Sequence, residues 1–371
     1  MTTPSAPRSR RSSRRSTRTT TCRRSIRVSR DVVIEGRVVR IREPGDASVL
    51  ELVARPIRDP GPGEVRVAVH AAGLNRADVM QRKGFYPAPH GVPADVPGLE
   101  HAGVVESIGE GVVEWKVGDR VMGIVGGGAM ASHVLVHARE LVRVPDAMSF
   151  TDAAAIPEVF MTAWDALFVQ ASLRPGMTVL VHAVGSGIGT AVLQIARRVG
   201  ARPIGTSRSA EKLARCEQRL GLEHGLVVAS QKGIAPAFSS QVLALTEGRG
   251  ADVIVDTVGG GYLEENVRSL APHGTIVCLG LLAGAQGSLP MGLLLGKRAR
   301  IVGSVLRSRP LEEKIALAQR FAREALPWLA RGELLPVVDR VLPIESIAEA
   351  HRAMEDDANV GKIVLTLSDP A

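Results

Sequence analysis

The stretch VLVHAVGSGIG, residues 179–189, decides the fold of this chain. Val179–Val181 is a short apolar run of the kind that forms a strand buried on both faces. Glycines follow at Gly185, Gly187 and Gly189, and residues 190–199 (TAVLQIARRV) repeat apolar side chains at helical spacing. A strand, a glycine turn and a helix in this order predict a dinucleotide site, because residues without Cβ let the backbone approach a pyrophosphate and the first N–H groups of a helix attract its charge. The spacing departs from GxGxxG, and a glycine turn that only packs the helix against the strand is the alternative.

Beyond this stretch, predicted strands and helices alternate. The later strands are expected at 203–206, 225–229, 252–256, 274–279 and 300–305, with helices at 210–220, 241–246 and 263–270. Repeated units of this length predict an α/β fold, a doubly wound parallel sheet with helices on both faces. The strand at 300–305 is expected at the sheet edge, where its unpaired backbone groups need cover.

The flanking segments predict a second domain. From residue 36 to about 150, short β-rich runs are separated by Pro-Gly turns, which indicates a mainly β domain. Residues 151–170 and 312–331 are predicted as helices, and 336–342 and 361–367 as strands that complete the β domain. The nucleotide domain would then be inserted between the two parts of the β domain.

Composition narrows the class of protein. Hydrophobic residues make up 45% of the 371 residues and no apolar run reaches the length of a membrane span. The cysteines Cys22, Cys216 and Cys278 are scattered without metal-ligand or disulfide spacing, so we expect a reducing, cytoplasmic location. The net charge of +8 is concentrated in residues 1–30, which hold ten arginines and no acid. The remainder is close to neutral and gives no basis for a nucleic-acid role.

The amino-terminal segment, residues 1–35, is predicted to be disordered. It is rich in Ser, Thr and Arg and nearly lacks large apolar residues, so it can bury too little to offset chain entropy. A transit peptide, a basic arm that touches RNA or a membrane, and an incidental extension remain open as interpretations.

Seven segments together resemble the medium-chain dehydrogenase/reductase superfamily, in its zinc-free quinone oxidoreductase branch. They are AAGLNRADVMQRKGFYP (71–87), VPGLEHAGVVESIGEGV (96–112), WKVGDRV (115–121), VHAVGSGIGTAVLQIAR (181–197), DTVGG (256–260), LLGKRARIVGSVLRSR (294–309) and NVGKIVL (359–365). The p53-inducible quinone oxidoreductase type is the most similar subgroup. The resemblance implies a GroES-like catalytic domain at 36–158 and 306–371 and a Rossmann domain at 159–305. It also implies a homodimer that pairs through the sixth strand.

The resemblance argues against a catalytic metal. Zinc-dependent relatives carry a Cys where this chain has Asn75 and a His where it has Leu99, and Glu100 alone cannot form a zinc site. His101 is one residue away, and that shift would point it elsewhere. Without a Lewis acid, the reaction left to the cofactor is hydride delivery to an acceptor that is already electrophilic. By resemblance, Asn75 and Tyr86 line the pocket and hydrogen-bond an acceptor oxygen as it gains charge. A turn residue and a half-buried ring are the structural alternatives, and we expect Asp78 to be structural.

The expected cofactor is NADPH, with NADH possible and no zinc. NAD enzymes place an acid at the end of the second strand, whereas this chain has Ser207 and Arg208 there. By resemblance, Lys212 would join them around a 2′-phosphate, although a Tyr that some relatives use is missing near Ala229. Other expected contacts, some from strand ends and some from resemblance, are Thr162, Gly185, Ser186, Gly187, Ile188, Gly189, Val258, Gly259, Leu279, Gly280 and Asn359.

Three functions remain in view. The first is NADPH-dependent reduction of small quinones, and the second is reduction of an alkenal, enone or enoyl thioester by the same chemistry. The acceptor pocket is expected in the loops 85–97 and 281–292, and this leaves the acceptor open. The third is RNA binding, as in zeta-crystallin-like relatives, aided by the basic tail. No membrane partner is expected.

Overall fold

The computed structural model describes residues 33–228 and 236–367. The predictions for residues 1–32 and for Ala229 concern residues outside these ranges. Among the described residues, no helix combines the length and the apolar character needed to cross a membrane. The cytoplasmic location stays a prediction.

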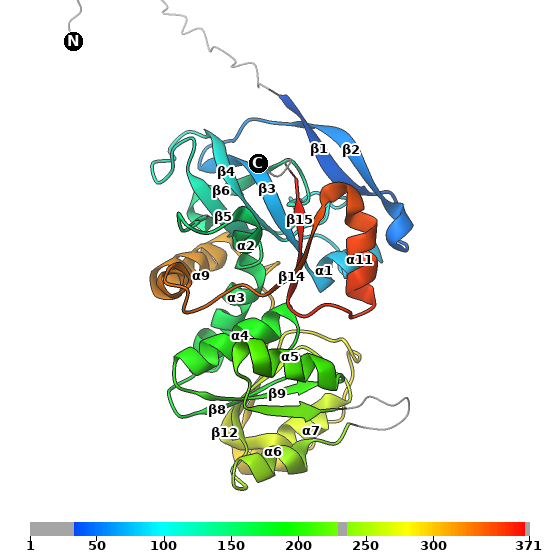
Figure 1. Ribbon diagram of the computed structural model, residues 1–371, viewed down its shortest axis with the longest axis vertical. Helices are drawn as coiled ribbons and strands as arrows, with labels where there is room; N and C mark the ends of the chain where they lie inside the picture. Colours follow the sequence, from blue (N-terminus) through cyan, green and yellow to red (C-terminus); the bar gives the residue numbers. More distant parts are fainter. Residues whose placement is uncertain (1–32, 229–235, 368–371) are drawn as a thin grey trace, which may run out of the picture. The chain divides into compact units, whose positions relative to one another are not determined.

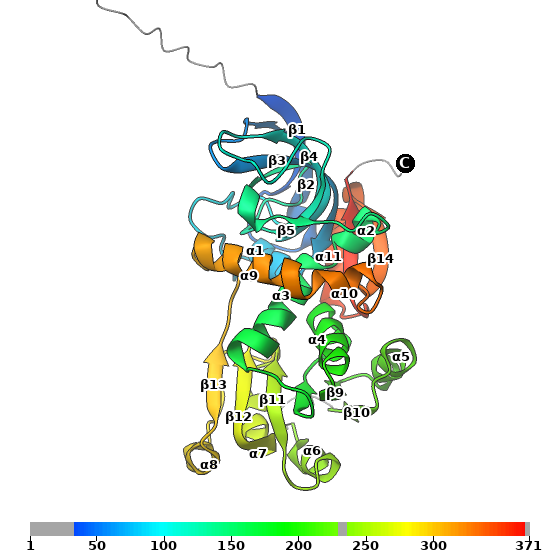
Figure 2. The same cartoon turned by 90° about the vertical axis from the view of Figure 1, so that its left-hand side faces the viewer.

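One of the two large sheets is the predicted parallel one. Its six strands run in the order β10-β9-β8-β11-β12-β13, and every neighbouring pair is parallel. Figure 1 shows α4 and α5 on one face and α6 and α7 on the other. The bounds are β8 Thr178–Val181, β9 Arg202–Ser207, β10 His224–Val227, β11 Ala251–Asp256, β12 Leu270–Cys278, β13 Arg300–Gly303, α4 Gly187–Arg198, α5 Ala210–Leu220, α6 Ser239–Leu245, α7 Tyr262–Ser269 and α8 Met291–Lys297. The doubly wound fold class is confirmed, and β13 lies at the sheet margin (Figure 2).

Alternating side chains of the central strands explain why both faces are covered. Val179 and Val181 pack with the residues of α4, whereas Leu180 between them packs with residues of α6 and α7. Each of these three side chains is fully buried, and burying one aliphatic side chain contributes roughly 1.5–3 kcal/mol. A continuous apolar run therefore gives a strand with helices on both sides.

The second sheet joins the two ends of the described chain. Its order is β14-β15-β3-β4-β5-β7, with β6 also paired to β3, and β1 and β2 form a separate antiparallel pair. The strands are β1 Ile34–Ile41, β2 Leu50–Ile57, β3 Glu64–Leu74, β4 Glu100–Ile108, β5 Arg120–Ile124, β6 His133–His137, β7 Val142–Arg143, β14 Val338–Pro343 and β15 Lys362–Thr366. The helices are α1 Arg76–Arg82, α2 Phe150–Ala153, α3 Pro157–Trp164, α9 Leu311–Glu324, α10 Leu326–Ala330 and α11 Ile347–Glu355.

The register of this sheet positions the site. β15 runs antiparallel to β3, with Ile363 opposite Leu74. On the other side of β3, Gly73 pairs with Glu100 at the start of β4. Three segments that are distant in sequence therefore meet at one end of the sheet. They are residues 73–75, residue 100 and residues 361–363.

Several predicted elements differ in their bounds. The predicted helix 151–170 is divided into α2, α3 and a π-helical turn at Asp165–Gln170, because Pro157 cannot continue a preceding helix and begins a new one. The predicted helix 312–331 is likewise divided near Pro327 into α9 and α10. α1 and α11 were not anticipated, α8 begins within the stretch expected as a loop, and β1 includes the last two residues assigned to the tail.

Candidate active site

The glycine turn connects β8 to α4 as predicted. The Ser186 hydroxyl caps α4 by accepting a hydrogen bond from the Gly189 main-chain N–H (3.0 Å). A Cβ at Gly189 would lie 2.5 Å from the carbonyl oxygen of Ala183, so this glycine is needed for packing. Gly187 and Ile188 are only half-buried, and the first N–H groups of a helix have no partner within it. The turn thus combines the packing role with an exposed helix start that fits a pyrophosphate.

The segment before β15 lies directly against this turn. The Gly361 N–H donates to the carbonyl oxygen of Gly185 (2.9 Å), and Ser186 and Gly361 form an isolated parallel bridge. The Asn359 side chain donates to the Gly361 carbonyl oxygen (2.6 Å) and so fixes its own loop. The segment that contains Asn359, an expected cofactor contact, therefore lies against the glycine turn.

Ser207, Arg208 and Lys212 lie together at the end of β9 and the start of α5. Lys212 donates from Nζ to the carbonyl oxygens of Asp357 and of Asn359 (2.9 Å to the latter), and burial lowers its pKa. Arg208 forms an ion pair with the Asp357 carboxylate. An acid therefore lies beside the second strand of the sheet, but it comes from the segment after α11, 149 residues beyond Arg208 in the sequence.

The expected contacts at the carboxyl ends of β11 and β12 also lie next to one another. Asp256 Oδ1 accepts hydrogen bonds from the N–H groups of Val258 (2.7 Å) and Gly259 (2.9 Å), and its carbonyl oxygen accepts from Leu279 (2.7 Å). A Cβ at Gly280 would lie 2.6 Å from the Thr257 carbonyl oxygen. The arrangement places the ends of both strands at the same edge as the glycine turn.

Thr162 on α3 provides a test of whether a cofactor fits. Its hydroxyl is buried and has no hydrogen-bond partner among the described residues. A buried hydroxyl without a partner is unfavourable by about 1–3 kcal/mol, so such a group in a native fold calls for a ligand or water. Together with the helix start of α4, this donor fits a bound nicotinamide dinucleotide.

Asn75 takes part in a buried polar cluster that the sequence did not reveal. Its amide nitrogen donates to Glu100 Oε1 (2.9 Å) and to the Gly73 carbonyl oxygen (3.3 Å), and its oxygen accepts from Lys362 Nζ (2.6 Å). Lys362 Nζ also contacts Glu100 Oε1 (2.6 Å) and donates to the Leu74 carbonyl oxygen (2.7 Å). Both amide hydrogens of Asn75 are thus used within the protein, so in this arrangement it has none for an acceptor oxygen.

The neighbouring Asp78 has the structural role expected of it. Its carboxylate accepts hydrogen bonds from the N–H groups of Asn75 and Gly98, both at 2.8 Å, which caps α1 and anchors the loop before β4. Burial raises the pKa of Asp78 to about 6.

Tyr86 is held by Arg307, which follows it by 221 residues in the sequence. The Arg307 guanidinium lies 4.9 Å from the centroid of the Tyr86 ring and donates to the Tyr86 carbonyl oxygen (3.2 Å). It also donates to the Gly126 carbonyl oxygen (2.6 Å) and to the Gln81 side chain (2.5 Å). Burial raises the pKa of Tyr86, so its phenol keeps its proton at neutral pH.

Glu158, at the start of α3, is the other group that sequence reasoning missed. Its main-chain N–H donates to Glu100 Oε2 (2.8 Å). Burial and the neighbouring Glu100 carboxylate raise the pKa of Glu158 to about 8. A Glu that follows a Pro at a helix start gives no signal by itself, because negative charge is ordinary in a first turn.

The positions that hold zinc in metal-dependent relatives have a different chemistry here. Leu99 is a core residue that is 1% exposed. His101 is fully buried in β4, and its Nε2 lies 3.3 Å from where a Cβ of Gly123 would be. Burial lowers the pKa of His101 to about 4. Across residues 33–228 and 236–367, no three His, Cys, Asp or Glu side chains are grouped so as to hold a metal ion.

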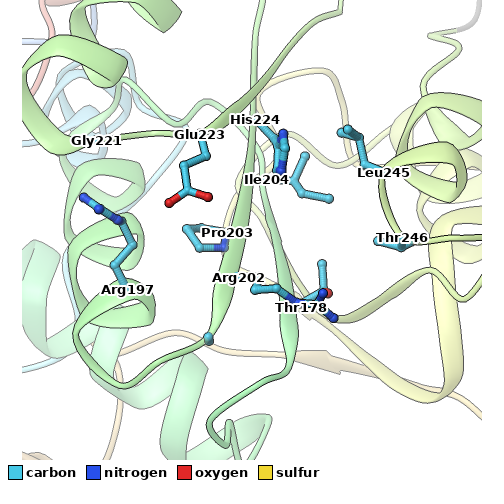
Figure 3. Close-up of a pocket in the computed structure, with 11 residues that line it drawn as sticks. Thr178, Arg197, Arg202, Pro203, Ile204, Gly221, Glu223, His224, Leu245 and Thr246 are labelled. Atoms are coloured by element: carbon cyan, nitrogen blue, oxygen red, sulfur yellow. The ribbon is translucent and has the colours of Figure 1, made fainter.

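A cavity of about 260 Å³ lies elsewhere on the parallel sheet (Figure 3). It is lined by Thr178, Arg202 and His224, which are the first residues of β8, β9 and β10. The glycine turn follows the carboxyl end of β8. The cavity is therefore at the opposite edge from the candidate site and takes no part in it.

Comparison with known proteins places this geometry in a family. The family model "Alcohol dehydrogenase GroES-like domain" matches residues 61–146, and the model "Zinc-binding dehydrogenase" matches residues 187–323. A synaptic vesicle membrane protein VAT-1 homolog from Rattus norvegicus is 33% identical over 346 residues, covering 86% of this chain and 81% of the relative. A quinone oxidoreductase-like protein 2 from Bos taurus is 33% identical over 318 residues, covering 85% of this chain and 88% of the relative.

A solved structure agrees with these matches. The apo form of JamJ enoyl reductase superimposes with a TM-score of 0.79 at 27% identity, covering 90% of this chain and 99% of the other. Sheet topology, glycine turn and sequence identity lead to one conclusion. This chain belongs to the medium-chain dehydrogenase/reductase superfamily, in its quinone oxidoreductase branch.

Proposed function

We propose that this oxidoreductase transfers reducing equivalents from NADPH to small quinones without a metal ion. The observation that carries the proposal is the position of the Lys362 ammonium, which contacts oxygen atoms of Asn75, Glu100 and Leu74. Zinc sites are built mainly from thiolate and imidazole ligands. A centre built from an amide, a paired carboxylate and a lysine does not fit zinc, and so favours an acceptor that is electrophilic by itself.

The preference for NADPH is supported by charge at the end of β9. Arg208 and Lys212 place two cations beside the Ser207 hydroxyl, and arginine suits a phosphate because its planar donors pair with two oxygens. Asp357 now engages both residues. A bound 2′-phosphate would take over these contacts, and NADH, which lacks the phosphate, would leave them in place.

The protein's own residues divide the remaining work. When bound, the reduced nicotinamide supplies a hydride. The N-terminus of α4 attracts the pyrophosphate, and the free hydroxyl of Thr162 is available to the cofactor. Tyr86, held by Arg307, offers a phenol to an acceptor oxygen as it gains charge.

Reduction of an enone, alkenal or enoyl thioester is the second candidate function. The similarity to JamJ enoyl reductase favours it, and the same chain residues would serve it.

We also propose a homodimer formed through β13. This strand is the sheet margin among the described strands, and apolar side chains are exposed on α8, which precedes it. Met291 is 54% exposed and Leu295 71%. An exposed strand edge beside apolar side chains is a surface that a second copy would cover.

Steady-state assays with the purified full chain test the proposal. NADPH oxidation is measured with 1,4-benzoquinone, 9,10-phenanthrenequinone and crotonyl-CoA, and repeated with NADH. We expect turnover of the quinones, a lower KM for NADPH than for NADH, and no loss of rate with a chelator. Preference for crotonyl-CoA would transfer the assignment to the second candidate. Stoichiometric zinc in the purified protein, or binding of neither dinucleotide, would refute both.

A further inference from the structure

We propose that Glu158 is the acid that protonates the acceptor after it has received a hydride. This inference rests on the proposed function, and it applies to a quinone and to an activated alkene alike. In both cases a two-electron reduction by hydride leaves an anion that needs one proton.

Helix geometry directs Glu158 to the cofactor side. Glu158 and Thr162 both lie in α3 and are four residues apart, so their side chains share one face of the helix. Thr162 carries the buried hydroxyl without a partner among the described residues that fits a bound dinucleotide. Glu158 is one turn closer to the helix start and is half-buried, so solvent can reach it.

The groups around Glu158 explain why it holds a proton. The carboxylates of Glu100 on β4 and Asp78 on α1 disfavour its ionisation, and the cations of Lys362 on β15 and Arg307 favour it. Burial is the largest influence, and together these groups raise its pKa to about 8. At pH 7 the group is therefore mainly a neutral carboxylic acid. An acid with a pKa near the working pH is the most effective proton donor.

The other carboxyl groups of the centre are occupied. Glu100 is bound by Lys362 and Asn75, and both oxygens of Asp78 accept main-chain hydrogen bonds. By contrast, the Glu158 carboxyl makes no hydrogen bond to any other residue in the described ranges. The Glu158 main-chain N–H donates to Glu100 Oε2 (2.8 Å), so Glu158 lies at the start of α3 beside the buried cluster of Asn75, Glu100 and Lys362.

Each bond that forms in the proposed step is matched by a bond that breaks. When bound, a reduced dinucleotide would supply the hydride and would itself be oxidised. The acceptor would gain a C–H or O–H bond to that hydride as its own π bond breaks. The resulting anion then takes the proton of the Glu158 carboxyl, whose O–H bond breaks. The carboxylate regains a proton from water, to which its half-buried position gives access.

The test combines an infrared readout with kinetics. In the wild-type full chain without cofactor, we expect an infrared C=O band of a protonated carboxyl that titrates near pH 8 and is missing in Glu158→Gln. Glu349→Gln, which changes an exposed glutamate on α11, should leave this band unchanged. In turnover, kcat should be constant below pH 8 and fall above it. Glu158→Gln should lower kcat by roughly 100- to 1,000-fold and remove this pH dependence, with the Kd for NADPH within twofold of wild type.

The outcomes separate the inference from the proposed function. Absence of the band at pH 7 would overturn the inference whatever the activity, and it would do so even if Glu158→Gln did not fold. A Glu158→Gln variant that keeps the wild-type rate and pH profile would overturn it as well. A band without NADPH turnover on any acceptor would refute the proposed function, and the proton donor with it. Glu158→Asp should support the inference by keeping the pH dependence at a reduced rate.

Discussion

Replacing Lys362 by methionine is predicted to destabilise the folded chain by about 3–5 kcal/mol. Lys362 is 3% exposed and Glu100 is fully buried. The lysine ammonium has three oxygen partners, on Glu100, Asn75 and Leu74. Methionine fills a similar volume but leaves the Glu100 carboxylate buried without its counter-charge. The remaining donors to Glu100, from Asn75 and the Glu158 main chain, are neutral.

Thermal unfolding of the full chain measures this effect. Proteins lose about 2 cal/mol/K of entropy per residue on folding, so in a chain of 371 residues the predicted loss lowers Tm by roughly 4–7 °C. The double variant Lys362→Met/Glu100→Gln removes the stranded charge and should lose about 2 kcal/mol less than the sum of the two single changes. Lys116→Met, at an exposed lysine, is the matched control and should stay within about 0.5 kcal/mol of wild type. A Lys362→Met variant as stable as this control, or strictly additive changes, would refute the argument.

Three further predictions follow from single contacts. Asp357→Asn should lower the Kd for NADPH about 5- to 10-fold and that for NADH less than twofold in fluorescence titrations, because the carboxylate now forms an ion pair with Arg208, one of the two cations expected to bind the phosphate. Equal changes for both dinucleotides would contradict this. Gly189→Ala should cost about 1–3 kcal/mol in urea unfolding, because its Cβ would meet backbone atoms at 2.5 Å. Gly292→Ala in α8, whose Cβ would meet no atom within 4 Å, should instead stabilise by up to about 1 kcal/mol, and a loss of stability as large as that of Gly189→Ala would contradict the packing argument. The hydrogen bond from Arg82 lowers the pKa of Glu355 to about 2. The stabilisation of the fold by this ion pair should therefore be complete above about pH 4.3 and be lost as the pH falls toward 2. Glu355→Gln should flatten the acid side of the plot of stability against pH, and an unchanged acid side would exclude the ion pair as its cause.

The sequence predicted those parts of the fold whose signals are local. α5 has the predicted bounds, Ala210–Leu220, because Ser209 caps its start and Gly221 ends it in the left-handed conformation. The long helices expected at 151–170 and 312–331 were wrong in their continuity. Both contain an internal proline, Pro157 and Pro327. Apolar periodicity predicts one continuous helix in each case, but a proline inside a helix removes a hydrogen bond and ends or divides the helix.

The candidate site was predicted where it follows strand ends and was missed where it depends on distant pairing. The glycine turn and the end of β9 could be located from strand–turn–helix order alone. Lys362 meets Asn75 across 287 residues of sequence, and Arg307 meets Gln81 across 226. Such contacts arise from the pairing of β15 with β3 and from the segment after β13, which periodicity does not specify.

The stretch from Asp357 to Lys362 touches both ends of the candidate site. Asp357 and Asn359 contact the cations at the end of β9, Gly361 abuts the glycine turn, and Lys362 holds the buried carboxylate. Neighbouring residues of a strand face opposite sides. One inserted or deleted residue here would therefore turn the Lys362 side chain away from the buried carboxylate and would also displace the contacts at the end of β9. A change in the length of this short connector would thus be far less tolerable than a change in its amino-acid composition.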